Sequence, residues 1–163
     1  IAQTWGVDVH RAAERLLPAG AIYFQMDEAD VRRVMQHPSA MIGSDGLPRD
    51  PNPHPRLWGT FPRVLGHYGR EEGLLPLPTA IHKMTGMAAR RFSLTGRGFI
   101  REGYFADVVV FDAATIADVA TYQNPKQKSA GIHAVFVNGL LTYRNNEMTG
   151  SRGGEFLSAP RAN

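Results

Sequence analysis

The segment VDVHRAAERLLPAGAIYFQMDEADVRRVMQHPSAMIG, Val7–Gly43, decides the fold class of this chain. Its apolar spacing predicts one helix over Val7–Leu17 and a second over Asp27–Gln36. Two short apolar runs, Ala21–Met26 and Ala40–Gly43, predict buried strands. Such alternation is typical of a parallel sheet with helices on its faces. Two strands cannot complete a sheet of this kind, so we expect the segment to be the end of a longer βα series.

A long stretch with five prolines, Leu47–Gly73, comes next. The prolines predict an irregular loop, and loops of this length inside a compact domain are usually functional. Beyond this stretch, Pro78 predicts the first turn of a helix, and Gly86–Phe92 predicts another.

The last third of the sequence carries β-type patterns. Gly98–Gly103 and Ala106–Asp112 are expected to form β-structure. Two further apolar runs, Ile132–Val137 and Leu140–Arg144, flank the dipeptide Asn138-Gly139. An Asn-Gly pair between apolar runs is the strongest short signal for a β-hairpin.

Composition excludes several classes of protein. The chain has 163 residues, of which 43% are apolar, and no cysteine, so it can form no disulfide and no thiolate metal ligand. No apolar run approaches the roughly 18–20 residues that cross a membrane, and no secretory signal is visible. We therefore expect a cytoplasmic protein without a membrane partner. The 18 basic residues are mixed with 15 acidic ones, which argues against a nucleic-acid partner.

Asp45 is the first candidate for a functional residue. It comes directly after the predicted strand Ala40–Gly43, and the carboxyl ends of strands carry the active sites of α/β barrels. A carboxylate at that position can bind a metal or transfer a proton. Because Ser44-Asp45-Gly46 is also typical of a simple turn, the residues alone leave both interpretations open.

Arg56 is the second candidate, eleven positions after Asp45 within the proline-rich stretch. Its planar guanidinium matches the geometry of a carboxylate. The simpler interpretation is an arginine that bonds to neighbouring carbonyl groups or to Asp50. The six histidines form no HxH, HxxxH or HExxH pair, so their spacing predicts no metal site.

Three segments carry a resemblance to a known family. They are MIGSDGLPRDPNPHPRLWGTFPRVLGHY (Met41–Tyr68), AIHKMTGMAARRFSLTGRGFIREGYFADVVVFD (Ala80–Asp112) and TYQNPKQKSAGIHAVFVNG (Thr121–Gly139). Together they resemble the N-acyl-D-amino-acid deacylases (D-aminoacylases) of the amidohydrolase superfamily. The third segment is similar to the deacylase branch in particular.

The resemblance implies the following organisation. Residues 1–95 would be the last βα units of a (β/α)8 amidohydrolase barrel, with a long active-site loop at residues 44–73. Residues 96–163 would be part of a small β-sandwich domain. A complete barrel takes roughly 250 residues, and the chain begins with Ile1 rather than Met. We therefore expect it to be one part of a longer protein.

The resemblance also implies chemistry. In such enzymes zinc-bound water attacks the amide of an N-acyl-D-amino acid, because zinc polarises the carbonyl and lowers the pKa of the water. Asp45 matches the aspartate after the last barrel strand, which takes the proton of the water, returns it to the leaving amine and can also touch a metal. Arg56 matches the arginine that holds the carboxylate of the substrate. The other zinc ligands match nothing here and are expected upstream of Ile1, so we expect the isolated chain to bind zinc weakly and to be inactive.

Two alternatives remain. The chain could be a non-catalytic fragment, or a structural or interaction module of a split amidohydrolase. It could also belong to a hydantoinase-like enzyme that opens cyclic amides, although Arg56 favours a substrate with a free carboxylate.

Overall fold

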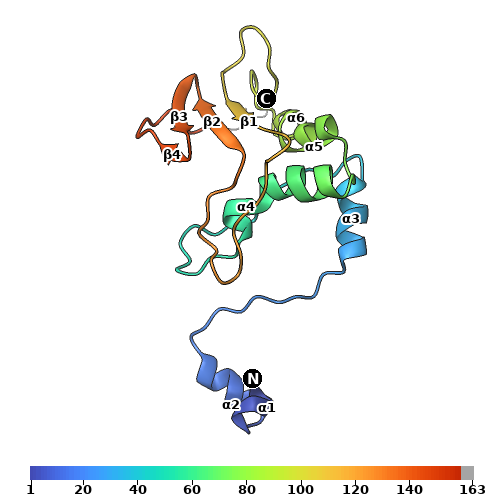
Figure 1. Ribbon diagram of the computed structural model, residues 1–163, viewed down its shortest axis with the longest axis vertical. Coiled ribbons are helices and arrows are strands. Elements are labelled where there is room, and N and C mark those ends of the chain that lie inside the picture. The colour runs from blue at the N-terminus through green and yellow to red at the C-terminus, as the bar shows by residue number, and fades with distance from the viewer. Residues whose placement is uncertain (159–163) are drawn as a thin grey trace.

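The computed structural model describes residues 1–158 and shows an α/β chain (Figure 1). Its elements follow one another in the order α1 (Ala2–Trp5), α2 (Val9–Leu16), α3 (Glu28–Gln36), α4 (Arg56–Arg63), the π-helix η1 (Val64–Glu71), α5 (Leu77–Met84), α6 (Gly86–Arg91), β1 (Val108–Phe111), β2 (Ile132–Val137), β3 (Leu140–Arg144) and β4 (Glu147–Met148). No helix within residues 1–158 is long and apolar enough to cross a membrane.

The helices predicted from local signals are confirmed. At the start of α2, the Asp8 carboxylate accepts hydrogen bonds from the backbone N–H groups of His10 and Arg11. At the start of α3, Asp27 accepts one from Ala29. Short carboxylates are good N-caps because they satisfy donors that have no acceptor inside the helix. Helices α5 and α6 also form where the sequence places them.

The four strands form one antiparallel sheet in the order β1-β2-β3-β4. Its centre is the predicted hairpin of β2 and β3, and both turn residues, Asn138 and Gly139, have positive φ angles of 49° and 78°. Asn-Gly adopts this turn at little cost, and the turn matches the twist of the two strands. The predicted β-structure at Gly98–Gly103 is wrong: the segment turns, because both of its end glycines have a positive φ.

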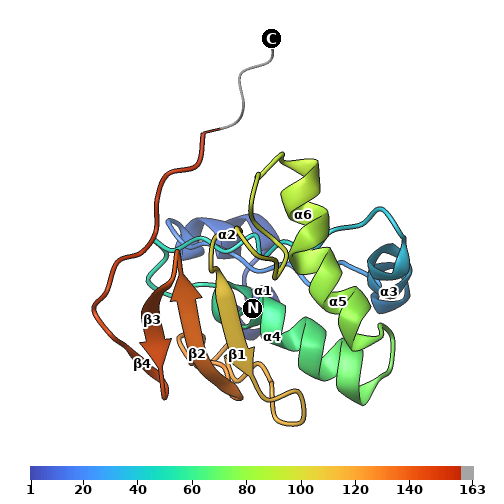
Figure 2. The same cartoon turned by 90° about the horizontal axis from the view of Figure 1, so that it is seen from above.

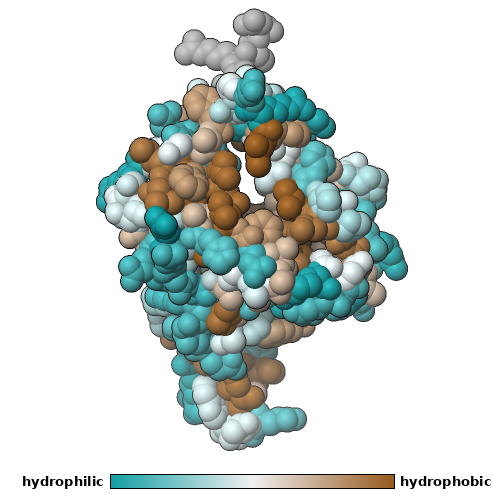
Figure 3. All heavy atoms as spheres, turned by 45° about the horizontal axis from the view of Figure 1, so that its top comes forward, coloured by the Kyte–Doolittle hydropathy of each residue, from teal (hydrophilic) through white to brown (hydrophobic). Residues whose placement is uncertain are grey.

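The predicted strands at Ala21–Met26 and Ala40–Gly43 do not form in this structure. The first of them runs without regular structure between α2 and α3, away from the sheet in Figure 1. The four strands of the sheet lie side by side in Figure 2. A strand needs a neighbour whose backbone can pair with it, and within residues 1–158 the four sheet strands pair only with one another. The side chains of Tyr23 and Phe24 are consequently 77% and 80% exposed rather than buried. Large apolar side chains also show as brown areas on the face drawn in Figure 3.

The predicted loop at residues 44–73 is wrong over most of its length, because residues 56–71 form the continuous helix α4–η1. Four of the prolines lie before this helix, and the last of these, Pro55, is its N-cap. Only Pro62 lies inside, and apolar side chains recur at helical spacing along the segment. Two side chains of this helix, Val64 and Tyr68, are buried. They form a core cluster with Met35, Leu75 and Ala80.

A buried lysine joins α5 to the chain before Asp45. The side chain of Lys83 is 3% exposed, and its ammonium donates to the carbonyl groups of His37 and Ala40 at 2.6 and 3.0 Å. The backbone carbonyl of Lys83 also accepts from the N–H of Ile42 at 3.3 Å. Both contacts fix the chain where it leaves α3.

One side of α4–η1 packs against residues 113–118, which follow β1. Two glycines permit the close approach: a Cβ at Gly59 would lie 2.8 Å from the Cβ of Asp118, and one at Gly66 would lie 2.5 Å from the carbonyl oxygen of Ile116. Two arginines on the same side complete the contact. Arg63 pairs with Asp118 at 3.3 Å, and Arg70 donates to the carbonyl of Ile116 at 2.6 Å.

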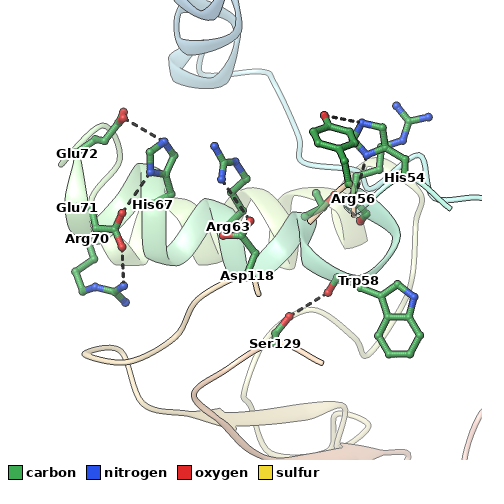
Figure 4. Close-up of polar contacts among 12 residues, drawn as sticks. His54, Arg56, Trp58, Arg63, His67, Arg70, Glu71, Glu72, Asp118 and Ser129 are labelled. Carbon is green, nitrogen blue, oxygen red and sulfur yellow. Dashed lines mark hydrogen bonds and ion pairs between the residues drawn. The ribbon is translucent and has the colours of Figure 1, made fainter. Parts of the chain in front are cut away.

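A further contact compensates for the proline inside this helix. Pro62 has no N–H, so the carbonyl of Trp58 lacks the donor that position i+4 normally supplies. The hydroxyl of Ser129 donates to this carbonyl instead, at 3.0 Å (Figure 4). The segment before β2 is thereby attached to the first half of the helix.

This arrangement predicts a coupled effect on stability. Ser129→Ala should lower the free energy of unfolding by about 0.5–1.5 kcal/mol, the usual net contribution of one hydrogen bond. In a Pro62→Ala background the same substitution should cost less, because the N–H of the new alanine can bond to Trp58. Urea unfolding of the four proteins of this double-mutant cycle measures the difference. An equal cost of Ser129→Ala in both backgrounds would contradict the assignment.

Candidate functional site

Asp45 lies in an irregular segment held against the start of α4, and the simple turn considered for Ser44-Asp45-Gly46 does not form. Its φ is 50°, a conformation that Asp tolerates better than most residues. The next residue, Gly46, touches the helix: a Cβ there would lie 2.5 Å from Cδ1 of Leu57 and 2.9 Å from its Cα. The segment is therefore fixed by close packing at Gly46, while the side chain of Asp45 stays 81% exposed.

Arg56 is the first residue of α4, and the structure brings it to Asp45. Its Nη2 lies 2.9 Å from Oδ2 of Asp45. Asp50, the other carboxylate considered for Arg56, instead accepts from the N–H of Asn52 at 3.0 Å. The Nε of Arg56 is buried, and within residues 1–158 it has no hydrogen-bond partner. The guanidinium thus keeps donor capacity beyond the ion pair.

The ion pair itself is weak. The side chain of Arg56 is 40% exposed and that of Asp45 81%. Solvent-exposed pairs typically contribute about 0–1 kcal/mol, because water screens the attraction. Arg56 can therefore exchange Asp45 for another carboxylate at little cost.

Two residues that were not predicted from the sequence, His54 and Tyr122, lie beside this pair. Nδ1 of His54 accepts the backbone N–H of Arg56 at 3.0 Å. The other ring nitrogen, Nε2, lies 3.3 Å from the hydroxyl of Tyr122. The spacing His54-Pro55-Arg56 is a local signal that could have indicated the first contact. No local signal indicates the second, because its partners are 68 residues apart.

A cavity of about 360 Å³ opens beside these residues. It lies along the first turns of α4, and the loop after β1 closes its other side. His54, Arg56, Thr60, Arg63, Asp118 and Tyr122 are among the residues that line it. The cavity therefore offers several polar groups to a small ligand close to Asp45 and Arg56.

The surroundings of His54 hold its pKa below the ordinary value. Burial of the imidazole is the largest cause, and the positive charge of Arg56 acts in the same direction. The negative charge of Asp45 opposes them. The neutral imidazole is thus favoured, and only this form can accept the N–H of Arg56 at Nδ1.

His67 lies elsewhere and does not join the pair. It sits towards the other end of α4–η1, where Nδ1 contacts Glu71 at 3.3 Å and Nε2 contacts Glu72 at 3.2 Å (Figure 4). Trp58 is 40% exposed, and its carbonyl accepts the hydroxyl of Ser129. Only Asp45 and Arg56 of the predicted site residues come together.

The donors described here do not make a metal site on their own. Within residues 1–158, no three His, Cys, Asp or Glu side chains lie close enough to hold a metal ion. A catalytic zinc needs about three protein ligands, and Asp45 supplies a single carboxylate. The residues that the structure describes do not fit a zinc ion without ligands from elsewhere.

Comparison with known proteins gives a consistent result. A model of the amidohydrolase family matches residues 4–143. The D-aminoacylase of Alcaligenes xylosoxydans xylosoxydans is 54% identical over 99% of this chain and 34% of its own length. The N-acyl-D-glutamate deacylase of the same organism is 57% identical over 88% of this chain and 29% of its own length. This chain therefore spans about a third of the length of these relatives.

A solved structure agrees with these matches. The N-acyl-D-glutamate deacylase of Bordetella bronchiseptica, complexed with zinc and a phosphonate that mimics the tetrahedral intermediate, superposes with a TM-score of 0.84. It is 53% identical, and the match covers 90% of this chain and 31% of that one.

The contacts of His54 predict opposite responses to two substitutions. Arg56→Gln should raise the pKa of His54, because it removes a neighbouring positive charge. Asp45→Asn should lower it further. An NMR titration of the imidazole in the full chain measures both, and shifts of the same sign would contradict the geometry.

The direction of the shift also fixes how stability depends on pH. Because the folded-state pKa of His54 lies below the unfolded value of about 6.5, the unfolded chain binds more protons as the pH falls below that value. The contribution of His54 to stability is therefore complete above the unfolded pKa and is lost as the pH falls towards the folded one. In Arg56→Gln this loss should become smaller, which urea unfolding between pH 7 and pH 5 can measure.

Proposed function

Because this chain belongs to the amidohydrolase family, we propose that it forms part of an enzyme that hydrolyses the amide bond of N-acyl-D-amino acids. One observation carries the proposal: the carboxylate of Asp45 and the guanidinium of Arg56 lie 2.9 Å apart at the start of α4. The deacylase names of the relatives support the substrate class.

The spacing of the pair suits such a substrate. In an N-acyl amino acid, three covalent bonds separate the acyl carbon from the carboxylate carbon. The group that binds the carboxylate and the group that transfers protons at the amide bond must therefore be close neighbours. Asp45 and Arg56 are neighbours, and they carry the two kinds of group required.

Arg56 binds the free carboxylate of the substrate. A guanidinium offers paired donors that match the two oxygens of a carboxylate, and its buried Nε has no other partner in the described part of the chain. This role favours linear N-acyl amino acids over cyclic amides, which lack a free carboxylate.

Asp45 transfers protons. Its exposed carboxylate accepts a proton from the attacking water and returns it to the nitrogen of the leaving amine, so it acts first as a base and then as an acid. Zinc is the metal that we expect in the complete enzyme. Asp45 contributes no more than one of its ligands, and the others come from parts of the enzyme outside this chain.

The proposal also accounts for the two predicted strands that do not form in this structure. In the complete enzyme, residues 1–95 would form the last βα units of the barrel, with Ala21–Met26 and Ala40–Gly43 as strands between neighbours. The exposed side chains of Tyr23 and Phe24 support this placement, because large exposed apolar groups often mark a surface that another segment covers. Residues 96–163 would contribute the antiparallel sheet to a small β-sandwich domain.

Asp45→Asn tests the base. The experiment uses a complete enzyme in which this chain replaces the matching third of the D-aminoacylase relative. General acid–base groups contribute about 10²–10⁴-fold, so kcat should fall by at least that order while KM changes little. A loss of less than about tenfold would contradict the role of Asp45. An inactive parent chimera that is folded and loaded with zinc would favour a non-catalytic module.

Arg56→Ala tests the carboxylate contact in the same enzyme. A hydrogen bond to a charged group is worth roughly 1.5–3 kcal/mol, so kcat/KM for an N-acetyl-D-amino acid should fall about 10- to 150-fold, mainly through KM. Arg56→Lys should recover part of the loss, because an ammonium lacks the planar fork.

The control substrate is the carboxamide of the same N-acetyl-D-amino acid. Wild type and Arg56→Ala should hydrolyse it about equally, since it presents no carboxylate. If the variant loses as much on the carboxamide, Arg56 only holds the chain in place.

A further inference from the structure

Tyr122, from a segment distant in the sequence, contacts the imidazole of His54, and Phe24 in turn contacts Tyr122. Nδ1 of His54 accepts the backbone N–H of Arg56, and Nε2 lies 3.3 Å from the hydroxyl of Tyr122. The rings of His54 and Tyr122 pack edge to face with centroids 5.2 Å apart. Phe24 also packs edge to face with Tyr122, with ring centroids 5.1 Å apart.

The contact with the N–H of Arg56 fixes the tautomer of His54. Because Nδ1 accepts a hydrogen bond, it carries no proton, so the neutral ring has its proton on Nε2. The Nε2–H group then donates to the hydroxyl oxygen of Tyr122. Within residues 1–158 each ring nitrogen has one hydrogen-bond partner, and rotation of the ring would break both bonds.

Arg56 depends on its backbone for its position. As the first residue of a helix, its N–H has no acceptor inside the helix, and Pro55 provides no side-chain cap. His54 supplies the missing acceptor. The guanidinium has one weak partner, the exposed Asp45, so side-chain contacts alone hold it loosely.

We propose that His54 and Tyr122 are positioning residues that orient Arg56 for the carboxylate of the substrate. Tyr122 holds the imidazole, the imidazole holds the N–H of Arg56, and the first turn of α4 directs the guanidinium towards Asp45. This inference rests on the proposed function, since it assigns to Arg56 the binding of that carboxylate.

The contact between Tyr122 and His54 connects the C-terminal region to the candidate site. Tyr122 belongs to the segment after Asp118, which packs on α4, and so to the region proposed to lie outside the barrel. Its hydroxyl reaches back to His54, two positions before Arg56. Affinity for the substrate therefore depends on a residue from the C-terminal region, although that residue touches no reacting atom.

Tyr122→Phe and His54→Asn test the inference in the chimeric enzyme. Tyr122→Phe keeps the ring but removes the hydroxyl. His54→Asn keeps an acceptor for the N–H two residues later, as Asn does in turns, but cannot reach Tyr122. Each should raise KM for an N-acetyl-D-amino acid by roughly 2- to 12-fold, the range for one neutral hydrogen bond, with kcat within about twofold.

The double variant His54→Asn/Tyr122→Phe should behave like either single variant, because all three lose the same contact. His54→Ala, which also loses the acceptor for Arg56, should raise KM further. None of these variants should change kcat/KM for the carboxamide substrate, which does not use Arg56.

Tyr143→Phe is the matched control. It removes a hydroxyl that donates to Asn146 at 2.7 Å in the hairpin of β3 and β4, away from α4, so both substrates should be unaffected. Additive effects of the two single variants, equal losses on both substrates, or an unchanged KM in Tyr122→Phe would each overturn the inference.

Arg56→Ala, measured alongside, separates the two hypotheses. If it discriminates between carboxylate and carboxamide while Tyr122→Phe has no effect, the positioning role fails and the proposed function stands. If Arg56→Ala does not discriminate, the proposed role of Arg56 fails, and the inference fails with it.

Discussion

The close packing of residues 113–118 against the helix α4–η1 is the contact on which the rest of this structure depends. It requires Gly59 and Gly66, because a Cβ at either position would collide with the opposing segment. Arg63 and Arg70 then fix the alignment, one through a carboxylate and the other through a backbone carbonyl. The chain that leaves β1 is thereby held along the helix, and it continues from there towards Tyr122 and Ser129.

The candidate site follows from this alignment in two steps. The helix carries Arg56 at its first position. The segment around Gly46 packs on Leu57 and brings Asp45 within 2.9 Å of Arg56. The segment beyond Asp118 then places Tyr122 against His54. Charged groups thus carry the chemistry proposed for the site, whereas close packing and neutral hydrogen bonds provide its geometry. Exposed ion pairs contribute too little free energy to fix the geometry as well.

The sequence predicted the features that depend on near neighbours. The caps at Asp8 and Asp27 and the Asn138-Gly139 hairpin are decided within a few residues, and all of them form. Features that depend on distant partners were missed. The segment Ala21–Met26 has the composition of a strand, but no segment within residues 1–158 is available to pair with it. The helix after Pro55 was hidden by prolines, although its one internal proline is compensated by Ser129, a residue 71 positions from Trp58. Asp45 and Arg56 were named as candidates from the sequence and lie together in the structure, whereas His54 and Tyr122 were not named.

The weakness of the Asp45–Arg56 pair is consistent with the proposed chemistry. A buried ion pair would have to be broken at the cost of several kcal/mol before a substrate could bind. An exposed pair exchanges one carboxylate for another with little change in free energy, so the α-carboxylate of a substrate can replace Asp45 on Arg56 and leave that aspartate free to accept a proton. Such an exchange requires that the guanidinium stay in place while its partner changes. In this structure that requirement falls on the backbone of the first helical turn, and therefore on the imidazole of His54.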